Sequence, residues 1–167
     1  MGRTVRLDVL GPFQAHWSDG SILEVAGKKI QGLLGYLAVE SGRPHTREQV
    51  AALLWSETGD ERARHNLRQA LSKIRRTYGP LIVSAGETLE LDRELCSADV
   101  MDFERFAKSA DVNDLSRCME LYRADLLDGL VLREALYDEW LLGAQHRLRR
   151  IACEIMERLA TRLADAG

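Results

Sequence analysis

Residues 60–78 read DERARHNLRQALSKIRRTY, and this stretch decides the fold. Its apolar residues recur at helical spacing, so we expect a long helix that packs one face on a core. Asp60 and Glu61 suit the positive end of a helix N-terminus. Gly79 and Pro80 then end the pattern, because glycine accepts a left-handed conformation there and proline cannot continue a helix. The apolar face comprises Ala63, Leu67, Ala70, Leu71, Ile74 and Tyr78.

The opposite side of this helix is polar and basic. Residues 60–78 hold six basic residues and two acidic ones, whereas the whole chain of 167 residues has a formal net charge of -3. Arginine, lysine, asparagine and glutamine side chains reach base edges and phosphates in a DNA major groove. We therefore predict a DNA-binding site on the outward face of this helix. Its residues are Arg62, His65, Asn66, Gln69, Ser72, Lys73 and Arg76, while Arg64, Arg68 and Arg75 flank the apolar face.

The segments that precede this helix have two different periods. Polar and apolar residues alternate over 6–10 and 13–17, and a short apolar run follows over 22–25. These patterns predict a small antiparallel sheet of short strands. From Lys28 the spacing becomes helical and continues until Gly42, so we expect the first helix there.

A second, shorter helix and a hairpin complete the order. Thr46 stands three residues before Gln49, which is the spacing of a capping box, and the apolar run that follows ends near Trp55. After the basic helix, residues 81–83 and 89–91 can pair as a hairpin. A capped helix, a loop, a longer basic helix and a hairpin are typical of a winged helix-turn-helix.

The rest of the sequence is all-helical, with helices expected over 99–107, 114–127 and 136–164. We therefore predict an α+β fold with a winged helix-turn-helix domain at 1–96. An all-α helical-repeat (TPR-like) domain, truncated so that it lacks its later helix pairs, is expected at 97–167. The two parts carry net charges of +1 and -4.

The last helix suggests an interaction surface. It places apolar residues on one stripe from Tyr137 to Leu163, and no later repeat is available to cover them. Exposed apolar surface of this length favours association with another protein, so we expect self-association or partner docking through this helix.

Short motifs in both parts match one family. They are Leu10-Gly11-Pro12-Phe13, Gly27-Lys28-Lys29 with Leu33-Leu34, Leu54-Trp55, residues 63–76, residues 102–106 and residues 121–127. With these motifs the chain resembles the antibiotic-regulatory-protein (SARP) type of bacterial transcription regulator. The resemblance implies a winged helix followed by a bacterial transcriptional activation domain (BTAD). It also implies an activator whose partners are double-stranded DNA, a second copy of the chain and RNA polymerase.

Two features depart from this family. Its hairpin usually carries a Gly-Tyr pair and a basic residue, whereas residues 87–91 here read ETLEL. An acidic hairpin should touch DNA weakly. The family's activation domain also runs through more helix pairs than residues 97–167 supply, so we expect the sequence to be a piece of a longer protein.

Few other residues suggest chemistry. Lys28 and Lys29 could hold phosphates at the start of the first helix. His16, His45 and His146 have no partner at metal or catalytic spacing, and Cys96, Cys118 and Cys153 form no C-x-x-C pair, so we expect packing or solvated histidines and free, mostly buried thiols. We expect no enzyme activity, no metal and no cofactor.

The absence of a long apolar run or signal-peptide pattern argues against a membrane partner and favours a cytoplasmic protein. The main alternative to DNA binding is a protein-interaction module. In that interpretation the winged-helix fold is kept within a larger signalling protein, and the acidic hairpin and acidic second part bind a partner protein.

Overall fold

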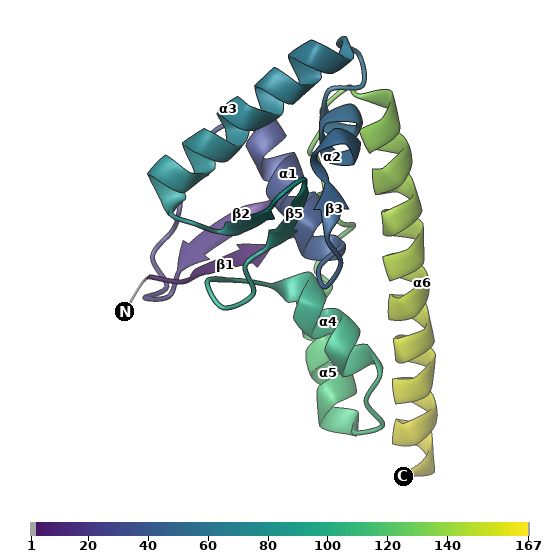
Figure 1. Cartoon of the computed structure of the whole chain (residues 1–167). Helices are drawn as coiled ribbons and strands as arrows, with labels where there is room; N and C mark the ends of the chain where they lie inside the picture. The colour runs from purple at the N-terminus through teal and green to yellow at the C-terminus, as the bar shows by residue number, and fades with distance from the viewer. Residues whose placement is uncertain (1–2, 167) are drawn as a thin grey trace.

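The computed structural model describes residues 3–166, so the ends of the two expected domains at Met1, Gly2 and Gly167 lie outside it. Short strands and helices alternate in the first half, and helices follow in the second (Figure 1). The strands are β1 (Val5–Asp8), β2 (Gln14–Trp17), β3 (His45–Thr46), β4 (Ile82–Ala85), β5 (Thr88–Leu91) and β6 (Cys96–Ala98). The helices are α1 (Lys28–Val39), α2 (Arg47–Leu54), α3 (Asp60–Tyr78), α4 (Asp99–Ala107), α5 (Val112–Leu121) and α6 (Ala135–Asp165). The predicted α+β class is confirmed.

The first sheet has the strand order β2-β1-β6, with β1 antiparallel to β2 and parallel to β6. The prediction of a strand over 22–25 is wrong. Only Ile22 bridges to His16, and Leu23 donates one backbone hydrogen bond to Ala15 before the chain leaves the sheet. Residues 96–98 take the free edge of β1 instead, because the parallel pairing buries Cys96 and Ala98.

The helix-turn-helix begins as the capping box predicts. The side chain of Thr46 accepts a hydrogen bond from the backbone N–H of Gln49, and the Gln49 side chain accepts one from the backbone N–H of Thr46. The last helix of the motif, α3, ends at Tyr78, and the next residue, Gly79, has a φ of 95° in the left-handed region. The hairpin β4-β5 follows, and its strand β5 also pairs with β3, the short strand that directly precedes α2 in the sequence. The second sheet therefore ties the hairpin to the helix-turn-helix.

The fifth helix is shorter than the sequence predicts, because α5 ends at Leu121 instead of continuing to 127. The following residues run back along the end of β1. Leu126 bridges to Leu10, and the backbone N–H of Leu127 donates to the carbonyl oxygen of Val9 at 2.8 Å. Both leucines are fully buried, so the apolar burial and the backbone pairing replace the last helical turns.

One hydrophobic core runs through both parts of the chain. The two glycines Gly32 and Gly35 let α1 approach the second part closely. A Cβ atom at Gly32 would lie 2.7 Å from the side chain of Leu132, and one at Gly35 would lie 2.8 Å from that of Leu127. The expected boundary between residues 96 and 97 falls inside β6. That residues 1–96 and residues 97–167 are two separate domains stays a prediction.

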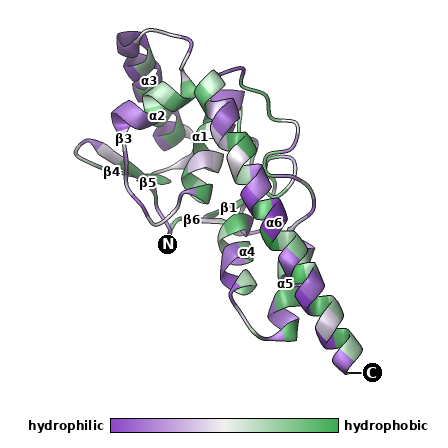
Figure 2. Ribbon diagram, turned by 90° about the vertical axis from the view of Figure 1, so that its right-hand side faces the viewer, coloured by the Kyte–Doolittle hydropathy of each residue, from purple (hydrophilic) through white to green (hydrophobic). Residues whose placement is uncertain are grey.

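The apolar stripe of α6 is mostly covered by its own chain. Tyr137, Leu148 and Ile155 are buried, and α6 packs along α5 and against α2 (Figure 2). Towards the C-terminal end Leu159 is half-buried and Leu163 is 66% exposed. The surface available for self-association is therefore much smaller than the sequence pattern suggests.

Candidate nucleic-acid interface

The outward face of α3 carries the side chains that the sequence predicts. Arg62, His65, Gln69, Lys73 and Arg76 are exposed, as is the nearby Ser72. Asn66 differs from them because it is half-buried at the edge of this face. The predicted apolar face is buried in the core with one exception: Leu71 is half-buried, since it lies beside the hairpin.

The positive charge of α3 is not neutralised within the molecule. In residues 3–166, no carboxylate lies within salt-bridge distance of any of the basic side chains of α3. Several arginines outside α3 are paired: Arg147 contacts Glu104 at 2.6 Å, and Arg149 contacts Asp125 at 2.5 Å. The unpaired basic side chains of α3 are Arg62, Arg64, Arg68, Lys73, Arg75 and Arg76. An exposed helix that carries unpaired cations produces a positive potential that attracts anions.

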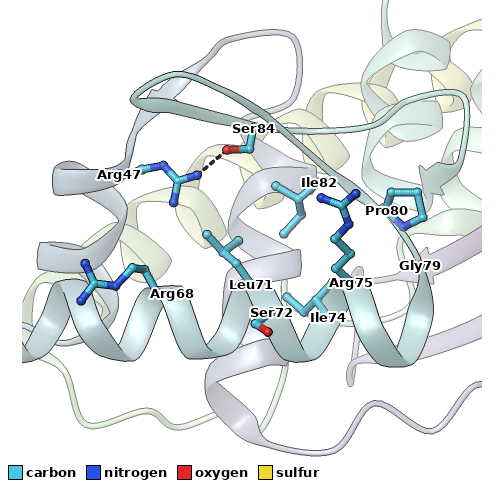
Figure 3. A pocket seen from close by; sticks show the side chains of 10 residues that line it. All are labelled: Arg47, Arg68, Leu71, Ser72, Ile74, Arg75, Gly79, Pro80, Ile82 and Ser84. Atoms are coloured by element: carbon cyan, nitrogen blue, oxygen red, sulfur yellow. Dashed lines mark hydrogen bonds between the residues drawn. The ribbon is translucent and has the colours of Figure 1, made fainter.

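A groove separates α3 from the hairpin. It has a volume of about 340 Å³, and the half-buried side chains of Leu71 and Ile82 form part of its wall (Figure 3). Arg68 and Arg75 border it from α3, and Arg47 borders it from the start of α2. The Arg47 guanidinium donates hydrogen bonds to the Ser84 hydroxyl and to the Gly86 carbonyl oxygen. Arg47 is not among the residues predicted from sequence, because its neighbours in the groove are distant in the chain.

The two lysines of α1 lie in different environments. Lys28 is exposed, whereas the ammonium of Lys29 is 2.5 Å from a carboxylate oxygen of Glu134 and donates to the carbonyl oxygen of Leu54. Glu134 also accepts hydrogen bonds from the Ser56 hydroxyl at 3.1 Å and from the backbone N–H of Glu57 at 3.0 Å. Lys29 therefore joins the loop after α2 to the start of α6 and is not part of the α3 face.

The contacts of Glu134 predict a pH-dependent stability. Burial alone would raise its pKa, but hydrogen bonds from Lys29, Glu57 and Ser56 hold the pKa below its usual value of 4.5. Its contribution is thus present above the unfolded pKa and is lost as the pH falls through the folded one. We expect Glu134→Gln to lower the free energy of unfolding by about 1–2 kcal/mol at neutral pH.

Urea unfolding of both proteins checks this expectation. The two stabilities should converge as the pH falls below 4.5, because the wild-type carboxylate becomes protonated when the pH passes its lowered pKa. A difference that stays constant from neutral to acid pH would contradict a role for the ionised carboxylate.

The cysteines and histidines give no sign of a reactive centre. Burial raises the pKa of the Cys96 thiol to about 12 and that of Cys118 to about 11, so both are protonated at neutral pH. Cys96 and Cys118 are buried and Cys153 is exposed, so the three thiols are free and mostly buried, as expected. His16 contacts Asp8 at 3.2 Å. Within the described residues no cluster of His, Cys, Asp and Glu could hold a metal ion, and no helix is long and apolar enough to cross a membrane.

A capped α2, a turn, the longer basic α3 and the hairpin β4-β5 define a winged helix-turn-helix fold, which α4–α6 extend with a helical part. No family model and no curated protein matches the sequence. A solved structure of Mycobacterium tuberculosis EmbR in complex with a low-affinity phosphopeptide is similar in fold, with a TM-score of 0.72 at 20% sequence identity. The similarity covers 93% of this chain and 44% of the EmbR chain.

This similarity extends over both the winged helix and the helical part, so the two occur together in a known structure. This chain spans less than half of the EmbR chain. The winged-helix fold predicted from sequence is supported by this match.

Proposed function

We propose that this chain is a transcription regulator that binds double-stranded DNA sequence-specifically, with α3 in the major groove. The main support is the set of exposed cations on α3 that lack a carboxylate partner in the described part of the chain. DNA phosphates supply the partner that such a surface lacks. The capped α2 and the turn before α3 support the same mode, because the second helix of a helix-turn-helix is the one that enters the groove.

The helical part is proposed to contact other proteins. From the resemblance in sequence we propose an activator that works as a homodimer on repeated half-sites and contacts RNA polymerase. The exposed end of α6 around Leu163 is the apolar surface that supports a contact of this kind. Sedimentation with and without a two-site duplex tests the dimer.

The experiment that tests DNA binding is selection of bound sequences from a random duplex pool, followed by a salt titration. We expect an enriched motif and a steep fall of affinity with salt, at about 0.9 logarithmic units per logarithmic unit of salt for each phosphate contact. A pool that stays random and a chain that binds no duplex at low salt would contradict the proposed function.

Gln69 should contribute to sequence preference. It is exposed on α3, and its amide can make two hydrogen bonds to an adenine edge. We expect Gln69→Ala to weaken binding to the selected duplex by about 1–3 kcal/mol and to relax the preference at one base pair. Binding to a mixed duplex should change little. Competition measurements with single-base variants of the selected duplex check this, and an equal loss on all duplexes would argue against base contact.

A protein-binding role is the second candidate, and the hairpin favours it. Residues 82–91 contain Glu87 and Glu90 but no lysine or arginine. EmbR was solved with a phosphopeptide, so peptides are suitable first ligands to try in this role. The random-pool selection separates the two candidates, because a chain of the second kind would enrich no DNA sequence.

A further inference from the structure

The turn between α2 and α3 is placed by polar contacts. Residues 56–62 are all half-buried or exposed, whereas the apolar residues on either side of them, Trp55 and Ala63, are buried. Within the turn, the backbone N–H and the hydroxyl of Thr58 both donate to the carbonyl oxygen of Trp55. The start of α3 at Gly59 has no side-chain cap in the part of the chain that the structure describes. Further restraint on the turn therefore comes from other segments.

Glu134, at the start of α6, supplies this restraint. It occupies the N-cap position of α6, but its side chain makes no capping hydrogen bond to that helix within residues 3–166. Instead, its carboxylate accepts hydrogen bonds from the backbone N–H of Glu57 at 3.0 Å and from the hydroxyl of Ser56 at 3.1 Å. The backbone N–H of Ala135 lies 3.5 Å from a carboxylate oxygen of Glu57 in return. The turn and the start of α6 thus contact each other in both directions.

Lys29 of α1 completes this contact. Its ammonium is 2.5 Å from the carboxylate of Glu134, donates to the carbonyl oxygen of Leu54 and lies 5.5 Å from the centre of the Trp55 ring. A cation at this place stabilises the C-terminal end of α2, because the last carbonyl groups of a helix carry partial negative charge. The Glu134 side chain is only 10% exposed, so solvent screens this ion pair less than a surface pair.

We propose that Lys29 and Glu134 are positioning residues for DNA binding, which set the orientation of α3 by holding the turn before it. The first buried residue of α3 is Ala63, so the turn determines where the exposed first turn of the helix lies. Neither positioning residue touches the duplex. Lys29, which the sequence predicts as a phosphate contact, thus has a different role. The inference rests on the proposed function, since it needs α3 to be on DNA.

The first test measures DNA binding by two single variants of the whole chain. Glu134→Gln turns an amide NH2 group towards hydrogen-bond donors, and Lys29→Met removes the ammonium but keeps an apolar side chain of similar length. We expect each folded variant to bind the selected duplex about tenfold more weakly, a typical coupling between separate sites. The salt slope should stay unchanged, because no phosphate contact is lost. A slope that falls by about 0.9 in Lys29→Met would assign Lys29 to a phosphate and overturn the proposal.

A double variant and a matched control separate positioning from general stability. Lys29→Met/Glu134→Gln should bind about as weakly as one single variant, because both side chains act through one contact. Tyr137→Phe is the control. It removes the hydrogen bond from the Tyr137 hydroxyl to the carbonyl oxygen of Gly32 at 3.2 Å, which links α6 to α1 without touching the turn. The control should retain wild-type affinity, and a loss equal to that of Glu134→Gln would overturn the proposal.

Amide hydrogen exchange reports on the turn directly. We expect faster exchange at Glu57 and in the first turn of α3 in Glu134→Gln, and no change there in Tyr137→Phe. Variants that exchange faster in the turn but bind the selected duplex as the wild type does would overturn the positioning role and leave DNA binding by α3 in place. A wild-type chain that binds no duplex would overturn both.

Discussion

Replacing Lys73 by glutamate should abolish DNA binding. The side chain is exposed on α3 and has no carboxylate partner among residues 3–166, so its charge is available to DNA. The change removes one favourable charged contact and introduces a repulsive one, and each is worth about 1.5–3 kcal/mol. A loss of about 3 kcal/mol or more is at least a hundredfold in affinity. Fluorescence anisotropy on selected and mixed duplexes measures this loss.

The stability of the Lys73→Glu variant should match that of the wild type, because the side chain makes no contact with the core. Lys108→Glu is the matched control: Lys108 is exposed at the end of α4 and also lacks a carboxylate partner in the described residues. It should retain wild-type affinity. A folded Lys73→Glu protein that binds its site as the wild type does would remove α3 as the reading helix.

The largest effect on stability is expected from Asp99→Ala. The carboxylate of Asp99 is 2% exposed and accepts hydrogen bonds from the backbone N–H groups of Val9 at 2.9 Å and Leu10 at 3.0 Å. Arg123 donates to it at 3.2 Å. Alanine would leave three buried N–H groups without this acceptor, those of Val9, Leu10 and Val100, at about 1–3 kcal/mol for each. We therefore expect a loss of about 3 kcal/mol or more in the free energy of unfolding, measured by urea denaturation.

Asp102→Ala provides the comparison within the same helix. Its carboxylate is 29% exposed and pairs with Arg6 and Arg105. Partly exposed pairs of this kind contribute about 0–1 kcal/mol, so the variant should stay close to the wild type. Asp99→Asn keeps one acceptor oxygen and should fall between the two. Equal losses for Asp99→Ala and Asp102→Ala would show that burial of Asp99 does not matter.

The parts of the fold that depend on local signals could be predicted from sequence. The capping box at Thr46 and Gln49 formed as expected, and α3 ended at Tyr78, before Gly79. These features are set by residues a few positions apart, whose hydrogen bonds and conformational preferences act within one turn.

The parts that depend on distant contacts could not be predicted. The strand β6 has only three residues, and its partner Val5 lies some ninety positions earlier, so no periodic pattern marks it. Residues 122–127 carry a helix-like pattern, but burial against Leu10 ends the helix at Leu121. The pairing of Lys29 with Glu134 could not be predicted either, because the two residues are 105 positions apart in the sequence.

For the candidate site, the sequence predicted which side chains lie on the exposed face of α3 but not what surrounds them. The wheel pattern separated exposed from buried positions, because helix geometry alone determines them. It left open whether Arg64, Arg68 and Arg75 meet acidic neighbours or phosphates. In the folded chain no carboxylate pairs with them among the described residues, and two of the three face the hairpin groove.

The contact at Glu134 has a mechanical consequence. Glu134 precedes α6 directly and is hydrogen-bonded to Ser56 and Glu57 in the turn before α3 and to Lys29 of α1. The 31 residues of α6 extend about 46 Å from that point, and its other end lies far from α3 (Figure 1). Because α6 begins at this contact, a shift of its first turn would also move the turn that precedes α3.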